Sequence, residues 1–219
     1  MEITWYGLGC FRMNERGYPA IVTDPFYDEE VGCELPHLTT EVITLSTPLD
    51  NGRDEVRWTG MRGHPHVFAS PGEFELGGLF VSGIASYRDN KKGSKRGQNI
   101  IYTFSLNGLS ICHLGDLGHV PNQSQIETIG PVNVLLVPVG VPSGMTPAMA
   151  SEVISLIEPN IIIPMNYKTP GLKNVQRKTV DRFLKEMGMS QEKPQESLKV
   201  SSSAIPDDTE IVLLKPKQD

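Results

Sequence analysis

Three largely apolar runs in the second half of the chain constrain its fold more than any other feature. They span residues 109–114, 133–138 and 161–165. Runs of this length and composition are typical of strands that are buried on both faces of a sheet. Polar residues follow the first and the third run, so we expect polar groups to meet where these strands end.

The remainder of the first two thirds of the chain also favours strands. Short apolar or alternating runs are separated by Gly, Asn and Pro, and Asn107-Gly108 is a hairpin signal between two of them. The expected strands are 3–6, 10–13, 20–23, 41–45, 67–69, 80–85 and 100–104, with two more near the C-terminus at 198–201 and 210–214.

Helices are expected only late in the chain. Asn122 is a suitable N-cap for a short helix, and Thr146-Pro147 begins a second helix that stops before Pro159. A third amphipathic helix is expected over residues 175–187. Many strands with a few amphipathic helices predict an α+β four-layer αββα sandwich, which we expect to form a single domain over residues 1–219.

Charge and composition exclude several classes of partner. The net charge is -6 and the isoelectric point is about 5.4, whereas nucleic acids and anionic membranes favour basic surfaces. The sequence has no apolar run of about 18 residues and no signal-peptide pattern at Met1. Three scattered cysteines (Cys10, Cys33, Cys112) are typical of a reduced protein, so we expect a cytoplasmic location.

Polar side chains that follow the expected strands are the candidates for a site. Asp24 precedes a proline, Asp116 lies in Gly115-Asp116-Leu117-Gly118-His119, and Asn166 and Lys168 follow the last of the three apolar runs. Each aspartate could alternatively act only as a turn residue. If the strands are neighbours, these side chains converge at one rim, where sandwich enzymes place their sites.

The whole chain resembles the metallo-β-lactamase fold, in the branch that includes ascorbate-6-phosphate lactonase and related metal-dependent hydrolases. The strings that carry the resemblance are Met1-Glu2-Ile3-Thr4-Trp5, Pro71–Gly78, Cys112–Asp116, Leu135–Gly140 and Pro164–Pro170. The resemblance implies the αββα sandwich and a metal site at the strand ends. It also implies a homo-oligomer, as in many relatives.

The chain departs from this family almost only in the metal ligands, so the resemblance implies a degenerate metal site. The histidine-rich string of the family falls on Thr47, Leu49, Asn51 and Gly52, and a slip of one residue would add only Asp50. Further ligand histidines fall on Leu8, Arg88 and Asn166. Of the ligand positions, only Asp116 keeps a family ligand.

This pattern argues against zinc chemistry, because a zinc hydrolase needs at least three strong ligands to activate water. We therefore expect no metal cofactor and a non-hydrolytic protein that binds a small anionic ligand or acts through protein contacts. Arg88 is expected to replace the ion by pairing with Asp116 or Asp24. The alternative for Arg88 is a side chain that points into solvent.

A competing hypothesis is that the chain is an active hydrolase of a small anionic or lactone-like substrate. It would use zinc or manganese held by His64, His66 and an aspartate such as Asp116, or metal-free acid–base chemistry from Asp24, Asp116 and His119. The sequence also contains a basic loop, Lys91–Arg96, which we interpret first as a solvated turn and second as a contact for phosphate or an acidic partner.

Overall fold

The computed structural model describes residues 1–26, 31–47, 58–60, 64–190 and 193–217. The helices are α2 (Gln123–Ile129), α3 (Pro147–Ile157) and α4 (Asp181–Glu186). The strands are β1 (Glu2–Gly7), β2 (Cys10–Asn14), β3 (Ile21–Thr23), β4 (Leu38–Thr40), β5 (Val42–Thr44), β6 (Trp58–Gly60), β7 (His66–Phe68), β8 (Gly72–Leu76), β9 (Leu79–Tyr87), β10 (Gln98–Leu106), β11 (Leu109–His113), β12 (Val134–Pro138), β13 (Ile161–Met165), β14 (Leu198–Lys199) and β15 (Glu210–Ile211).

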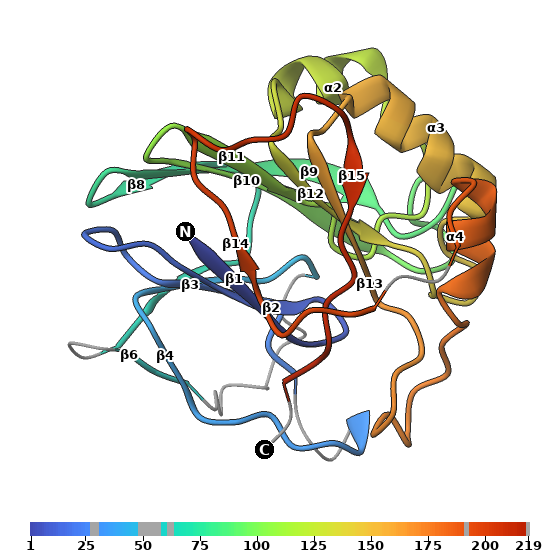
Figure 1. Ribbon diagram of the computed structural model, residues 1–219, viewed down its shortest axis with the longest axis horizontal. Coiled ribbons are helices and arrows are strands. Elements are labelled where there is room, and N and C mark those ends of the chain that lie inside the picture. Colours follow the sequence, from blue (N-terminus) through green and yellow to red (C-terminus); the bar gives the residue numbers. More distant parts are fainter. Residues whose placement is uncertain (27–30, 48–57, 61–63, 191–192, 218–219) are drawn as a thin grey trace.

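Two mixed sheets pack face to face, which confirms the predicted sandwich (Figure 1). One has the strand order β14-β1-β2-β3-β5-β7 and the other the order β15-β13-β12-β11-β10-β9-β8. The helices α2, α3 and α4 lie on the outer face of the seven-stranded sheet. On the outer side of the six-stranded sheet, the described residues include the separate pair β4-β6.

The three apolar runs form the parallel centre of the seven-stranded sheet, as their composition predicts. β11, β12 and β13 pair in parallel, and every residue of β12 and β13 is buried. Burial on both faces explains the absence of alternation, because one face packs on the other sheet and the other on the helices.

The predicted caps of the first two helices are confirmed. The side chain of Asn122 accepts from the backbone N–H of Gln125, whose side chain in turn accepts from the N–H of Asn122. Thr146 caps α3 through the N–H of Met149, and Pro147 occupies the first helical position. Both helices therefore begin where their sequence provides partners for the first backbone donors.

The third helix is shorter than predicted and begins only at Asp181. The chain before it is held by tertiary bonds instead: the N–H of Lys178 donates to the carbonyl oxygen of Gly140, and the N–H of Lys168 donates to that of Lys178. These bonds use backbone groups that a helix would need, so residues 168–179 form a non-helical connection between β13 and α4.

The strand directions bring one set of strand ends to a common rim. β3 and β5 run parallel in one sheet, and β11, β12 and β13 run parallel in the other. The two sets are joined at the rim, because the N–H of Ile100 donates to the carbonyl oxygen of Ser46 and the N–H of Asn166 donates to that of Leu8. In the described part of the chain, no helix is long and apolar enough to cross a membrane.

Candidate functional site

The rim collects the polar residues that the sequence places after its strands. Asp24 follows β3, Asp116 follows β11 and Asn166 follows β13. Asp24 and Asn166 have positive φ angles of 37° and 58°, conformations that are uncommon outside glycine. Strained backbone of this kind is frequent at binding sites, where the surrounding structure holds it in place.

Asp24 lies beside a buried histidine. One oxygen of Asp24 accepts from the N–H of Ser46 at 2.6 Å, and the other lies 4.0 Å from Nε2 of His113. Burial raises the pKa of Asp24, and the nearby His113 and the Ser46 N–H oppose this rise. Burial likewise lowers the pKa of His113, which Asp24 and the carbonyl oxygen of Gly9 oppose. Both groups are therefore biased towards their neutral forms.

His113 has no nitrogen lone pair left for a metal. Its Nδ1 accepts from the N–H of Gly115 at 3.1 Å, which assigns the ring proton to Nε2. Nε2 then donates to the carbonyl oxygen of Gly9 at 2.9 Å. His113 is thus a structural residue that joins the two sheets.

Asp116 is held by two arginines. Nε of Arg88 and Nη2 of Arg96 each donate to Oδ2 of Asp116 at 2.8 Å. Arg96 also donates through Nη1 to the carbonyl oxygen of Arg88 at 2.8 Å. Arg88 therefore makes the contact with Asp116 that the sequence predicts, but through one bond rather than a bidentate pair, and a second arginine shares the same oxygen.

The loop that carries Arg96 is built around Asp89. Its two carboxylate oxygens accept from the backbone N–H groups of Lys91, Gly93, Lys95 and Arg96 at 2.7–3.0 Å. Burial acts to raise the pKa of Asp89, but the four N–H donors outweigh this effect and lower that pKa. The loop is therefore an ordered turn whose lysines are exposed, as our first interpretation expected, while Arg96 contacts Asp116.

We expect Asp89→Asn to loosen this loop in a manner that depends on pH. Because the folded-state pKa is lowered, the stabilisation by the carboxylate is complete above its unfolded pKa of about 3.9 and is lost as the pH falls through the lowered value. The stability difference between wild type and variant should be largest near neutral pH and shrink in acid. Urea unfolding as a function of pH measures it, and a difference independent of pH would contradict this role.

A third arginine reaches the same region from the connection before α4. Nη1 of Arg177 donates to the carbonyl oxygen of Gln176, while its Nε is buried and has no hydrogen-bond partner among the described residues. Burial lowers the pKa of Arg177; Asp116 opposes this change, and Arg96 and Arg88 add to it. Oδ1 of Asp116 is also buried without a described partner. We call Arg88, Arg96 and Arg177 the arginine cluster.

Three glycines allow these segments to pack closely. A Cβ at Gly118 would overlap the carbonyl group of Arg88, and a Cβ at Gly140 would overlap Cα of Tyr167 and lie 2.7 Å from the carbonyl oxygen of Lys178. A Cβ at Gly115 would lie 2.5 Å from the side chain of Ser46. The cluster therefore depends on close contacts, two with backbone and one with a side chain, that a Cβ at these positions would disrupt.

The other predicted rim residues differ in their placement. Leu8 is buried with φ of 50°, and Nδ2 of Asn166 donates to the carbonyl oxygen of Gly115 at 3.4 Å. Thr47 and Lys168 are exposed. Leu49, Asp50, Asn51 and Gly52 lie outside the described residues.

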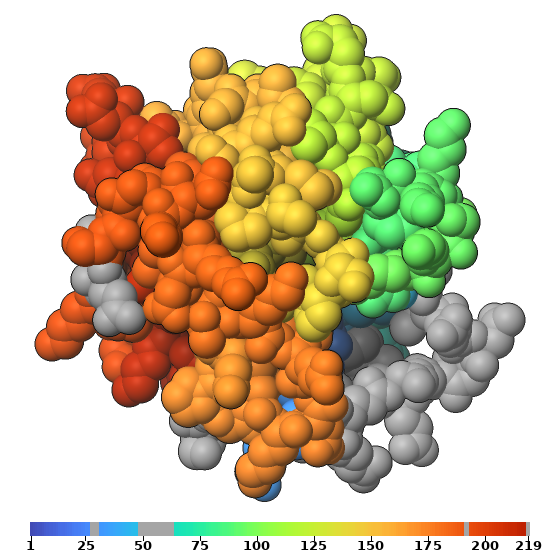
Figure 2. Space-filling model, turned by 90° about the vertical axis from the view of Figure 1, so that its right-hand side faces the viewer, coloured from blue at the N-terminus to red at the C-terminus, as the bar shows by residue number. Residues whose placement is uncertain are grey.

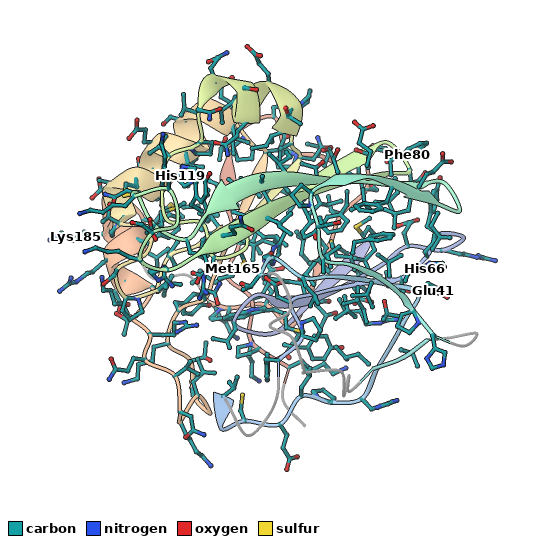
Figure 3. All side chains as sticks on the ribbon, turned by 180° about the vertical axis from the view of Figure 1, so that it is seen from behind. Glu41, His66, Phe80, His119, Met165 and Lys185 are labelled. Carbon is teal, nitrogen blue, oxygen red and sulfur yellow. The ribbon has the colours of Figure 1, made fainter. Side chains whose placement is uncertain are left out.

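The histidines proposed for a remade site are not brought together with Asp116 and His119. His66 begins β7, opposite Val42 at the start of the parallel strand β5, whereas the rim is at the other end of β5. Figure 3 shows His66 beside Glu41 and far from His119. His64 and His66 are exposed. His119 accepts at Nε2 from the N–H of Tyr87 and donates from Nδ1 to its neighbour Val120.

The described rim residues do not fit a zinc ion. Both ring nitrogens of His113 and of His119 are already bonded, and Oδ2 of Asp116 is held by two cations. Within the described ranges, no group of three or more His, Cys, Asp or Glu residues is placed to hold a metal. Zinc sites need three or four such donors, and arginine offers none.

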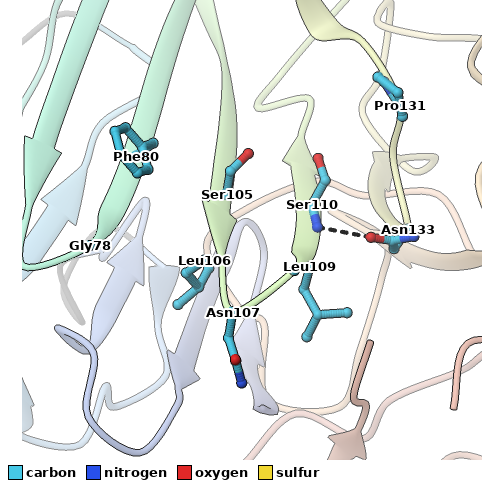
Figure 4. A pocket seen from close by; sticks show the side chains of 10 residues that line it. Gly78, Phe80, Ser105, Leu106, Asn107, Leu109, Ser110, Pro131 and Asn133 are labelled. Carbon is cyan, nitrogen blue, oxygen red and sulfur yellow. Dashed lines mark hydrogen bonds between the residues drawn. The ribbon is translucent and has the colours of Figure 1, made fainter. Parts of the chain in front are cut away.

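A cleft of about 450 Å³ lies elsewhere on the seven-stranded sheet. Its walls include Phe80 and the residues around the Asn107-Gly108 turn, and the N–H of Ser110 bonds to the side chain of Asn133 across it (Figure 4). This turn is at the opposite end of β10 from the rim, so the cleft contains none of the predicted site residues.

Sequence reasoning missed two members of the arginine cluster. Arg96 lies in the basic loop that we first assigned to solvent, and Arg177 lies in a stretch predicted as helix. The available signal was charge: the stretch Arg88–Gly97 contains five Lys or Arg residues and one acid, in a chain whose net charge is -6.

The sequence matches a known protein family. Residues 2–166 match the family model described as the β-lactamase superfamily domain. A UPF0173 metal-dependent hydrolase of Lysinibacillus sphaericus is 24% identical over 196 residues, which cover 77% of this chain and 86% of the relative. A UPF0173 protein of Pyrococcus abyssi is 26% identical, with 78% of this chain and 85% of the relative covered.

Solved structures agree with this assignment. A protein of Thermotoga maritima that is assigned to the Zn-dependent hydrolases of the metallo-β-lactamase superfamily has a TM-score of 0.75 and 34% identity, with 98% of each chain covered. A metallo hydrolase of Ignicoccus hospitalis, with a TM-score of 0.63 and 17% identity over 90% of this chain and 97% of the other, shares the fold. The chain therefore belongs to the metallo-β-lactamase superfamily.

Proposed function

We propose that this chain binds a small anionic ligand through the arginine cluster and does not act as a zinc hydrolase. In this proposal the cluster occupies the place of the metal, so that positive charge is supplied by guanidinium groups. Binding requires no metal and no hydrolysis. Assembly into a homo-oligomer and a cytoplasmic location remain predictions from the sequence.

The observation that carries the proposal is that Oδ2 of Asp116 accepts hydrogen bonds from two arginines. Arg88 and Arg96 converge on one carboxylate oxygen. Arg177 lies in the segment that bonds to Gly140 through the N–H of Lys178, close in the chain to Gly144, which approaches Arg96. Two guanidinium groups contact Asp116 and a third lies in the neighbouring segment, so positive charge is in excess even when Asp116 and Asp24 are both ionised. Arginine forks bind carboxylates and phosphates in paired hydrogen bonds, so an anion is the ligand that this excess favours.

A metal-dependent hydrolase of a small anionic or lactone-like substrate is the second candidate. It is favoured by the names of the relatives from Lysinibacillus sphaericus and Thermotoga maritima, which describe metal-dependent or Zn-dependent hydrolases. The described rim residues count against it, because they lack the three strong donors that a zinc ion needs. The two candidates differ in what they require, because only the second needs a bound ion.

Arg177→Gln tests the proposed function with inorganic phosphate as the probe. Phosphate should raise the unfolding temperature of the wild type in metal-free buffer, since a ligand that binds only the folded state stabilises it. We expect the variant to lose this shift in unfolding temperature, because it lacks the guanidinium group of Arg177. Arg16→Gln, an exposed arginine in the turn after β2, is the matched control. An equal phosphate response in Arg177→Gln and wild type would refute the proposal.

A further inference from the structure

Two stretches of this acidic chain concentrate its positive charge. Of the chain's 20 Lys and Arg residues, five lie in residues 88–97, which contain the basic loop, and four lie in residues 168–179, which we call the basic segment. Their only acidic residue is Asp89, whose carboxylate is taken up by four backbone N–H groups. Neither stretch therefore neutralises its own cations.

The fold places these two stretches next to each other. Residues after β12 lie between them: the carbonyl oxygen of Gly140 accepts from the N–H of Lys178, and a Cβ on Gly144 would lie 3.1 Å from Nη1 of Arg96. Figure 2 shows the green basic loop, the yellow residues after β12 and the orange basic segment together on one face. The fold thus brings the two stretches together although they are far apart in the sequence, and we call their combined surface the basic rim.

The cations of this rim fall into two groups by exposure. The arginine cluster is partly buried, with 31% of the Arg88 side chain and 20% of the Arg96 side chain exposed. The lysines are exposed, and they comprise Lys91, Lys92 and Lys95 in the basic loop and Lys168, Lys173 and Lys178 in the basic segment. An anion bound by the arginines would therefore have further positive charge on its solvent side.

We propose that the ligand is a small molecule with two or more linked phosphates, an inference that rests on the proposed function. A first phosphate would bind the paired donors of the arginine cluster, and a second would extend towards the exposed lysines. Lysine acts as a flexible point charge towards phosphate, whereas a single carboxylate or phosphate would leave these lysines unused. The ligand class follows from the arrangement of the cations, in which partly buried arginines lie beneath exposed lysines.

Isothermal titration calorimetry of the full chain with orthophosphate, pyrophosphate and citrate in metal-free buffer tests this inference. Pyrophosphate should bind the wild type at least about tenfold more tightly than orthophosphate and more tightly than citrate, which carries similar charge. Lys91→Ala/Lys95→Ala should weaken pyrophosphate about fivefold and orthophosphate less than about twofold. Both substitutions keep the N–H groups that bond Asp89.

A matched control removes two charges at the opposite end of the sheets. Arg16 follows β2, and Lys199 pairs with Glu2 at the start of β1, so Arg16→Ala/Lys199→Ala should leave all three affinities unchanged. If orthophosphate binds, but pyrophosphate binds no more tightly than orthophosphate or no more tightly than citrate, the linked-phosphate inference alone is overturned. Absence of binding by orthophosphate and pyrophosphate alike, with a folded protein, would overturn the proposed function as well.

Discussion

Asp116→Asn should strengthen phosphate binding by about tenfold while it lowers the stability of the unliganded protein. Removal of the negative charge leaves Arg88 and Arg96 with a neutral acceptor, so an incoming anion no longer competes with a carboxylate. We expect the free energy of unfolding to fall by about 1–2 kcal/mol, a figure discounted because the partners are partly exposed. Calorimetry with phosphate and urea unfolding measure the two effects.

The sign of this effect separates the two candidate functions. If Asp116 serves as a metal ligand, the substitution should weaken metal binding and any anion binding that depends on the metal. Asp208→Asn is the control, because Asp208 is exposed and lies near the start of β13, away from the rim. Weaker phosphate binding in Asp116→Asn than in wild type would contradict the competition that we infer.

Gly118→Ala should destabilise the protein by about 3 kcal/mol or more, or prevent folding. The new Cβ would overlap the carbonyl group of Arg88 and lie 2.6 Å from the backbone nitrogen of Asp89. These atoms are backbone and also hold the basic loop, so they cannot move without displacing Arg88 and Arg96. Gly130→Ala, which meets open space but has φ of 65°, should cost only about 1 kcal/mol.

Chemical denaturation of both glycine variants provides the measurement. Circular dichroism would first establish whether Gly118→Ala folds, and a folded variant should also lose the phosphate-induced rise in unfolding temperature. If Gly118→Ala and Gly130→Ala have equal stability, the close approach of the Arg88 backbone does not constrain this turn.

The sequence predicted those parts of the fold that depend on local pattern. Apolar runs identified β11, β12 and β13, and cap residues such as Asn122 and Thr146 identified the starts of two helices. Strand β8 was missed although Phe74 and Leu76 alternate with two glutamates, because Gly72–Leu76 is a short edge strand in which no residue is fully buried. Edge strands take their stability from pairing with a neighbour, which local composition does not reveal.

The sequence predicted the site residues that directly follow buried strands. It missed the residues whose position depends on contacts between loops. Asp24, Asp116 and Asn166 were located because a strand end fixes their position. Arg96 depends on the turn that Asp89 organises, and Arg177 depends on the backbone bond from its neighbour Lys178 to Gly140. Such contacts join residues far apart in the sequence, so a pattern of charges can indicate a function without indicating where the charges meet.

The most direct test of the arginine cluster as a substitute for the metal is the metal content of the purified, untagged protein. The protein would be incubated with zinc, manganese and iron, desalted and measured by elemental mass spectrometry. We expect less than about a tenth of an equivalent of any metal, because the described rim residues lack the three or more donors that tight zinc binding requires. A content near one or two equivalents would contradict the proposal and establish a metal site in this chain.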